Sequence, residues 1–380
     1  MLKSVKNRAL CIMLIVISVF TLSGNNLNAQ EGNSNVVSTG VPFLLIGPNS
    51  RFAGMGETGT ALSDDATAMH WNPSGLAFQT GTEINFTHSP WLAGLNIGDL
   101  FYDYIAAKKD IKSINGTVGA SLTYLNIGEI IFTNEAGQTD PTRNYKAYEL
   151  AFALGYATKL NQDFAVGFVT RFIYSRLSPN DLTVGGEQGT GTAFTMSFDL
   201  SGMWRPTSKN SPKFLKDKFS VGLNLSNLGP KISYVDADQA DPIPTQIRLG
   251  LAYEIFKNEG NSLTLTTDFA KLLVNRFQNA DGEFESDPFY EAIFTSWGGD
   301  VFNSIQTSIG AEYWYGNPRL IALRAGYFYE DPSYGNRKFI TLGAGIRYSL
   351  YGFDFSYIDA VEENHPLANT LRFGLTVNFK

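Results

Sequence analysis

Most of the chain, from Gly81 to its last residue, alternates between apolar and polar residues with a period of two. The pattern is clearest in the last block, where Leu371 and Phe373 alternate with Arg372 and Gly374. Successive side chains of a β-strand point to opposite faces, so a period of two places the two kinds of residue on opposite sides of a sheet. The alternation therefore predicts a chain built mainly from β-strands.

The alternating blocks are about ten residues long and are separated by turn residues. They predict fourteen strands, near residues 81–88, 100–108, 114–125, 146–158, 164–176, 191–204, 218–228, 244–256, 262–270, 304–315, 319–330, 337–348, 350–360 and 370–379. A tilted strand of about 9–11 residues crosses a bilayer, and bacterial single-chain barrels have an even number of strands. The length and number of the blocks therefore suit a transmembrane barrel.

A soluble β-sandwich would also alternate, but it would bury its apolar face. Here an aromatic-rich face recurs on every block over about 300 residues, which is more than a sandwich core needs. A closed barrel pairs every backbone group and leaves no sheet edge in lipid. We therefore predict an all-β, 14-stranded antiparallel outer-membrane β-barrel, whose last strand ends in Asn378-Phe379-Lys380.

The connections between the predicted strands differ in length and in charge. If both termini are periplasmic, every other connection faces the cell exterior and is expected to be long; these connections include 126–145, 177–190, 229–243 and 271–303. The outer connections then hold about 18 acidic and about 4 basic residues, and the inner turns about 10 basic and about 4 acidic. Connections that were merely charged would not separate by sign, so the charges support this assignment of sides.

Residues 1–29 are predicted to be a secretory signal peptide. Lys3, Lys6 and Arg8 precede the apolar run Ala9–Leu22, and Ala29 offers a small residue at the cleavage point. The alternative is an uncleaved anchor helix, but about 14 apolar residues span a bilayer poorly. We therefore expect the mature chain to begin at residue 30.

The single cysteine, Cys11, lies inside that apolar run and not at the cleavage point, so lipidation is not expected. The mature chain is then predicted to have no disulfide, thiol nucleophile or thiolate metal site. Loss of three basic residues from 29 leaves 26 against 36 acidic residues, a net charge of about −10. This charge argues against a nucleic-acid partner, which requires a concentrated basic surface.

The stretch Val41–Phe78 lacks the alternation, is rich in glycine and contains three prolines. We predict that residues 30–80 form a plug inside a barrel of residues 81–380. The plug residues of interest are Arg51, Gly54, Met55, Gly56, Asp64, Asp65, Trp71, Asn72 and Pro73. Arg51 and either Asp64 or Asp65 are expected to pair with charges of the lumen.

Charged residues also fall on the predicted inner faces of the strands. They are Arg171, Asp199, Arg248, Glu254, Asp268, Glu312, Arg324, Glu330, Arg347, Asp354 and Arg372. Their mixed signs favour internal ion pairs, because charges left unpaired in a closed lumen are costly. The alternative is a water-filled pore with a solvated wall. A tunnel for an acyl chain is disfavoured, since such a ligand prefers an apolar lining.

Two motifs in the plug suggest chemistry but have simpler interpretations. Gly54–Gly59 spells GxGxxG, yet the strand, helix and βαβ unit of a dinucleotide site are missing. We expect these glycines to allow close backbone packing. Residues 63–71 are predicted to form a short helix capped by Ser63, with Asp64 and Asp65 at its positive end and Pro73 after it. The alternative is that both aspartates and His70 bind a metal.

The other two histidines, His88 and His365, are candidate functional residues. His88-Ser89 could begin a lipid-deacylating site if an acid oriented the histidine. His365, which precedes Pro366, lies in a predicted outer connection and is interpreted as a loop residue. We therefore predict no catalytic residue, cofactor or metal site.

The run VPFLLIGPNSRFAGMGETGTAL followed by DDATAMHWNPSGLAF resembles the N-terminal signature of the PorV family. PorV proteins are barrels of the wider FadL-like class of long-chain fatty-acid transporters. Val41–Glu57 is the more specific part, whereas Asn72-Pro73 with Asp64 and Asp65 upstream is shared broadly across FadL-like proteins. In outline the resemblance spans the mature chain, from the plug to the last hairpin.

This resemblance implies an outer-membrane component of the type IX secretion system, not known for catalysis by its own residues. Such barrels bind cargo proteins through the cargo's C-terminal domain, take them from the large translocon barrel and deliver them to an attachment complex with a sortase-like protease. The expected contacts are the connections 271–303 and 126–145, with Trp91 and Trp297. The alternatives are a FadL-like transporter of hydrophobic small molecules and an outer-membrane lipid A deacylase. PorQ-like paralogues share the architecture.

Overall fold

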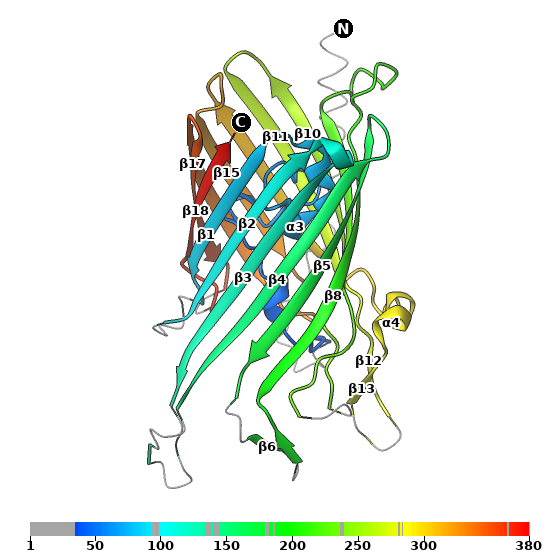
Figure 1. Cartoon of the computed structure of the whole chain (residues 1–380), viewed down its shortest axis with the longest axis vertical. Coiled ribbons are helices and arrows are strands. Elements are labelled where there is room, and N and C mark those ends of the chain that lie inside the picture. Colours follow the sequence, from blue (N-terminus) through cyan, green and yellow to red (C-terminus); the bar gives the residue numbers. More distant parts are fainter. Residues whose placement is uncertain are drawn as a thin grey trace. The chain divides into compact units, whose positions relative to one another are not determined.

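The computed structural model describes residues 35–92, 94, 99–131, 133, 138–139, 144–178, 182–184, 187–235, 239–279, 282, 284–362 and 365–379. Fourteen strands form one closed antiparallel barrel in which strands adjacent in the chain are neighbours and the last pairs with the first (Figure 1). The predicted fold is confirmed. The predicted signal peptide lies outside the described residues.

The barrel strands are β1 (Thr82–Pro90), β2 (Phe101–Ile111), β3 (Gly116–Ile130), β4 (Tyr145–Lys159), β5 (Phe164–Arg176), β8 (Thr192–Trp204), β9 (Phe219–Leu228), β10 (Gln246–Lys257), β11 (Asn261–Leu272), β14 (Gln306–Tyr315), β15 (Ile321–Tyr329), β16 (Lys338–Tyr348), β17 (Tyr351–Ala360) and β18 (Thr370–Phe379). Two hairpins stand apart from it, β6 (Leu182–Val184) with β7 (Glu187–Gly189) and β12 (Arg276–Gln278) with β13 (Phe284–Ser286).

The helical elements are short. They are η1 (Pro42–Leu45), α2 (Ser50–Ala53), α3 (Ala68–Trp71), η2 (Pro73–Phe78), η4 (Lys112–Ile114) and α4 (Phe289–Thr295). Within the described part of the chain, none of the helices has the length and apolar character needed to cross a membrane.

The two faces of each strand carry the residues that the alternation assigns to them. Phe353 and Leu375 are exposed on the outside of the barrel, whereas Asp354 and Arg372 are buried inside it. A row of aromatic rings crosses the outside of β2–β5 at spacings of 5.9 Å, through Phe101, Tyr124, Tyr148 and Tyr174. A second row, toward the opposite strand ends, contains Trp204, Phe219 and Tyr253. Two aromatic rows flanking an apolar band are typical of a barrel surface that faces lipid.

The segment before β1, residues 35–81, runs through the barrel, and we call it the plug segment. The N–H of Asn35 donates to the carbonyl of Ser333 (2.8 Å), in the connection between β15 and β16. This is the end of the barrel that carries the long connections, which we call the outer end. Thr82, at the start of β1, pairs with Phe379 at the opposite end. The described chain therefore starts at the outer end, whereas β18 finishes at the inner end as expected; the N-terminus itself lies outside the described residues.

Glycines allow the backbone of this segment to lie directly against the barrel wall. A Cβ atom on Gly54 would lie 2.9 Å from the Cα of Gly343, on β16. Gly56 has a φ of +69°, and a Cβ atom there would lie 2.7 Å from the nitrogen of Tyr327. These two glycines of the GxGxxG motif thus allow close backbone packing, as predicted.

The helix predicted for residues 63–71 is wrong at its start. It begins only at Ala68, and Ser63 donates from its Oγ to the carbonyl of Gly59 (2.8 Å) instead of capping it. Asp65 accepts a hydrogen bond from the N–H of Thr67 (2.9 Å), which holds this stretch as a turn. The helix ends at Trp71, before Pro73, as predicted.

Candidate functional site

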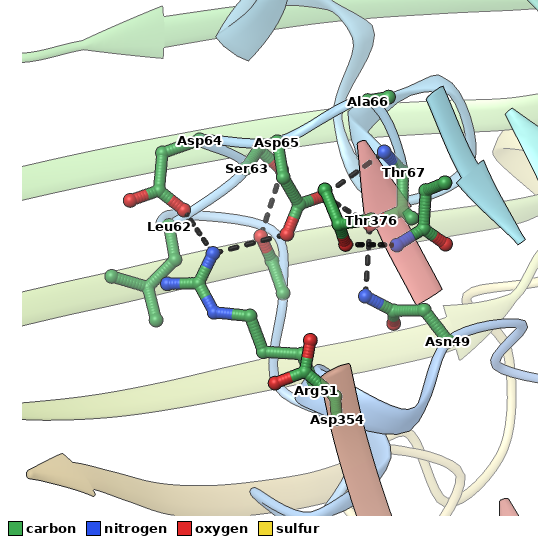
Figure 2. A network of polar contacts seen from close by, with 12 residues as sticks. Asn49, Arg51, Leu62, Ser63, Asp64, Asp65, Ala66, Thr67, Asp354 and Thr376 are labelled. Carbon is green, nitrogen blue, oxygen red and sulfur yellow. Dashed lines mark hydrogen bonds and ion pairs between the residues drawn. The ribbon is translucent and has the colours of Figure 1, made fainter. Parts of the chain in front are cut away.

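Arg51, on α2, is the centre of a buried ion-pair network between the plug segment and the barrel. Its Nε and Nη2 donate to the two carboxylate oxygens of Glu312 on β14, both at 2.8 Å. Its Nη1 donates to Asp64 (2.6 Å) and Asp65 (3.0 Å), toward which the guanidinium points (Figure 2). Bidentate pairing of this kind fixes geometry as well as charge. The expected pairing of Arg51 with a lumen charge is therefore present, in Glu312. Asp64 and Asp65, which were expected to pair with charges of the lumen, instead form their ion pairs with Arg51 of the plug.

The network continues along the barrel wall with alternating sign. Glu312 also accepts from Nε of Arg324 (2.9 Å), and Nη1 of Arg324 donates to Asp354 (2.8 Å). Asp354 in turn accepts from Nη2 of Arg347 (2.7 Å). These contacts connect the plug segment to strands β14 to β17.

Other lumen charges are paired in smaller groups. Arg171 contacts Asp199 (2.7 Å), Arg372 contacts Glu57 (3.2 Å), Arg337 contacts Glu330 (2.7 Å) and Arg248 lies 3.8 Å from Asp268. Glu254 differs, since it is only half-buried near the inner end of β10. A small polar cavity lined by His70, Arg171 and Arg248 among others remains beside the plug segment. A lumen with this charged lining is a poor route for an apolar molecule.

The Trp71-Asn72-Pro73 part of the plug motif has a structural role. The indole Nε1 of Trp71 donates to Oδ1 of Asn49 (3.0 Å). Nδ2 of Asn72 donates to the carbonyls of Thr60 (3.0 Å) and of Gly202 on β8 (3.2 Å). This motif therefore holds the plug segment to itself and to the barrel.

The candidate lipid-deacylating residues are only partly brought together. His88 Nδ1 lies 2.7 Å from Oδ1 of Asp103, and both side chains are on the outside of the barrel beside Phe101. Ser89, however, is buried on the opposite face and donates to the carbonyl of Leu371 (3.1 Å). An acid does orient the histidine, but the adjacent serine cannot reach it.

The alternative metal ligands do not converge. Asp64 and Asp65 are both engaged by Arg51, whereas His70 lines the polar cavity with Arg171 and Arg248. Nδ1 of His365 accepts from the N–H of Leu367 (3.1 Å) within its connection.

The connection between β11 and β14, which includes α4, exposes large aromatic side chains at the outer end. The exposed fractions are 58% for Tyr290, 77% for Phe294, 44% for Trp297 and 85% for Phe302. The exposed carboxylates of Glu285, Glu291 and Asp300 lie in the same connection. We call this surface, residues 284–302, the α4 surface.

The α4 surface is held in place by its own hydrogen bonds. One carboxylate oxygen of Asp287 accepts from Asn275 (2.9 Å) and from Thr295 (2.5 Å), which ties α4 to the chain before β12. These hydrogen bonds lower the pKa of Asp287 below its ordinary value. The indole Nε1 of Trp297 donates to the carbonyl of Ile293 (2.8 Å), and its ring lies 5.6 Å from the ammonium of Lys271. The aromatic groups are thus presented by an ordered element.

The two tryptophans proposed as partner contacts differ in environment. Trp297 is exposed in the α4 surface. Trp91 is half-buried, with its ring 6.1 Å from that of Tyr102 and 5.6 Å from the guanidinium of Arg372. Much of the connection 126–145 lies outside the described residues. The sequence predicted the connection 271–303 and the exposure of Trp297, but not the helix α4 or the exposure of Tyr290, Phe294 and Phe302. The predicted exposure of Trp91 is wrong, because its ring packs beside Tyr102.

Both the sequence and the fold of this chain are similar to those of known proteins. A sequence model of the family described as "Type IX secretion system protein PorV" matches residues 28–279. No curated protein sequence matches the chain.

Among solved structures, similar folds include the Pseudomonas putida toluene transporter TodX, with a TM-score of 0.50 and 12% identity over 87% of this chain and 98% of that one. A Pseudomonas aeruginosa FadL homologue has a TM-score of 0.50 and 12% identity over 91% of this chain and 100% of that one. At this identity the likeness concerns the fold alone.

The family match covers most of the chain and begins just before the plug motif. The closed barrel with its lipid-facing aromatic rows is that of an outer-membrane protein. The chain belongs to the PorV family of type IX secretion system proteins.

Proposed function

We propose that this barrel binds exported cargo proteins at the outer surface of the membrane through the α4 surface, recognising the cargo's C-terminal domain. It receives cargo from the translocon barrel and passes it to the sortase-like attachment complex. The observation that carries the proposal is an ordered outer connection that exposes several aromatic side chains to water.

Exposed aromatic groups on an ordered element favour protein binding for two reasons. Large apolar patches are rare on surfaces without a partner, and aromatic residues are enriched among those that dominate binding energy. The hydrogen bonds of Asp287 and Trp297 hold the α4 surface before any partner arrives. Less conformational entropy is then lost on binding.

The charge of the outer end suggests what such a partner presents. Glu285, Glu291 and Asp300 lie around the aromatic groups, so a partner face with apolar pockets and basic residues would be complementary. The charged lumen, with the segment before β1 packed against its wall, supports contact at the surface over passage through the barrel.

The proposal is tested by the affinity of the purified barrel for a purified cargo C-terminal domain. Phe294→Ala and Phe302→Ala are expected to weaken binding by at least about tenfold each, as loss of a central aromatic contact does. The matched control is Phe214→Ala, because Phe214 is 65% exposed in the inner turn between β8 and β9. This control is expected to leave the affinity unchanged.

Equal affinities for all three variants and the parent barrel would contradict a role of the α4 surface. Recovery of the barrel alone after cross-linking in native membranes would contradict cargo binding altogether.

Two other functions have some support. The fold likeness to FadL and TodX supports a transporter of hydrophobic small molecules, and an acyl chain found in the lumen by native mass spectrometry would favour it. The His88–Asp103 pair supports a lipid A deacylase. Unchanged lipid A acylation in a His88→Ala strain would remove that candidate.

A further inference from the structure

We propose that the inner turn between β8 and β9, residues 205–218, binds the headgroup of an anionic phospholipid in the inner leaflet of the membrane. Lys213 and Lys216 contact the phosphate, and Phe214 enters the adjoining acyl chains. We call this turn the β8–β9 turn. It lies at the opposite end of the barrel from the α4 surface, so the inference goes beyond the proposed function and does not rest on it.

Both ends of the β8–β9 turn lie at the second aromatic row, near the inner end of the barrel. Strand β8 ends at Trp204 and β9 begins at Phe219, and these two rings lie 6.0 Å apart. The third ring of the row, that of Tyr253, donates from its hydroxyl to the carbonyl of Phe214 (3.0 Å). Aromatic rows of this kind lie at the level of the lipid headgroups. The turn is therefore held at the membrane interface, on the outside of the barrel.

The first half of the turn is fixed by the neighbouring inner turn between β4 and β5. Oδ1 of Asp163 accepts from the N–H groups of Thr207 (2.8 Å) and Ser208 (2.7 Å). The N–H of Arg205 donates to the carbonyl of Asp163 (2.7 Å). The β8–β9 turn is thus ordered by the chain itself, and little conformational entropy remains to be lost when a ligand binds.

The second half of the turn contains one turn of helix. The carbonyl of Pro212 accepts from the N–H groups of Leu215 and Lys216, both at 2.9 Å. Residues three apart in a helical turn are neighbours on its surface. Lys213 and Lys216 therefore lie on the same side, with Phe214 between them in the chain.

The β8–β9 turn concentrates positive charge in a chain whose formal net charge is −7. It has one acidic residue, Asp217, and five basic residues, which are Arg205, Lys209, Lys213, Lys216 and Lys218. Arg205 is engaged by the plug segment, since its Nη2 donates to the carbonyl of Leu62 and its guanidinium lies 5.1 Å from the ring of Phe78. Within the described part of the chain, the four lysines of the turn form no ion pair.

A phospholipid matches both the charge and the apolar group of this turn. Phe214 is 65% exposed, although it lies beside lysines at the membrane interface. Basic residues at this level are attracted to anionic headgroups, and an aromatic ring next to them enters the boundary of the acyl chains. A soluble acidic polypeptide would match the lysines, but it would not account for the contact of the turn with the aromatic row.

Native mass spectrometry of the folded barrel, titrated with phosphatidylglycerol in detergent, tests the role of the lysines. The double variant Lys213→Gln with Lys216→Gln is expected to bind this lipid at least about tenfold more weakly. The matched control is Lys109→Gln with Lys112→Gln, which removes the same charge from exposed positions beside the inner turn between β2 and β3. The control is expected to leave the affinity unchanged. Equal losses in the two double variants would show a general attraction to the inner end and would overturn the proposal.

A second titration separates a lipid headgroup from a free phosphate. Phe214→Ala is expected to weaken the binding of phosphatidylglycerol at least about fivefold, because the ring no longer buries apolar surface. Heat-modified migration on gels verifies that the variant barrels are folded. Glycerol phosphate, which has no acyl chains, is expected not to displace the lipid. Displacement by glycerol phosphate together with an unchanged affinity of F214A would show a site for small anions and would overturn the proposal.

Photocross-linking in native membranes identifies the occupant. The photoreactive residue p-benzoylphenylalanine replaces Phe214, and the expected adduct is a phospholipid. The control position is Phe302, which is 85% exposed at the outer end, beyond the reach of the inner leaflet. A single protein adduct at position 214 would identify an acidic polypeptide instead, and equal phospholipid yields at both positions would show unspecific labelling. Either result would overturn the proposal.

Discussion

At the scale of single residues, burial decides what an ion pair contributes. Glu312 is buried between Arg51 and Arg324 and accepts hydrogen bonds from both. Arg276 and Asp241 form a pair of similar length (3.1 Å) at the outer end, where both side chains are partly exposed. The chemistry is the same, but only the first pair leaves a buried charge behind when one partner is lost.

Glu312→Ala is expected to lower the free energy of unfolding by about 3–5 kcal/mol, because it leaves two buried guanidinium groups without this carboxylate. Arg276→Ala, the control, is expected to cost less than about 1 kcal/mol. Both are measured by chemical unfolding in detergent, followed by tryptophan fluorescence. Equal losses would show that burial is not the controlling variable.

At the scale of elements, one carboxylate joins two parts of the outer connection between β11 and β14. Asp287 joins Asn275, before β12, to Thr295, at the end of α4. The hydrogen bonds from Thr295 and Asn275 lower its pKa from the ordinary value of 3.8. Its contribution to the stability of α4 is therefore fully present above that ordinary value and is lost as the pH falls through the lower, folded-state pKa.

The 5-fluorotryptophan resonance of Trp297 should report this loss. It is expected to stay constant from neutral pH down to about pH 5 and to shift only at more acidic pH. Trp314, in β14, provides an internal control. In Asp287→Ala the Trp297 resonance is expected to be shifted already at neutral pH. A resonance that is identical in the two proteins would contradict the role of Asp287.

At the scale of the whole molecule, the backbone of the plug segment lies in direct contact with the backbone of the barrel wall. Gly326, on β15, faces Met55 and Gly56 so closely that a Cβ atom would overlap both. A Cβ atom on Gly202, on β8, would meet only the ring of Phe164, at 3.5 Å. A methyl group is therefore excluded at the first position and accommodated at the second.

In planar bilayers the parent barrel is expected to show no steady ion conductance. Gly326→Ala is expected to displace the plug segment, lower stability by about 1–3 kcal/mol and increase conductance. Gly202→Ala should behave like the parent. Steady conductance of the parent barrel would contradict a filled lumen.

The sequence alone determined the strands and their faces. Each predicted strand lies within a few residues of an observed one, and the predicted inward charges Asp354 and Arg372 are buried. The reason is physical: lipid on one side and a packed lumen on the other make the two faces of a strand chemically different along its whole length. Every block therefore shows the period of two that is typical of a barrel strand.

Only the tertiary structure decided which residues meet. That Arg324 lies between Glu312 and Asp354 depends on strand register, and that β8 extends beyond β9 depends on where β9 turns. The helix predicted to begin at Ser63 begins at Ala68 instead. Asp64, expected at the start of that helix, accepts a hydrogen bond from Arg51, 13 residues away in the chain, and this contact is likewise set by the tertiary structure. The alternation and the composition predict whether a side chain faces lipid or the lumen. Which side chains pair with each other depends on how the barrel closes around its plug segment, because the paired residues are far apart in the chain.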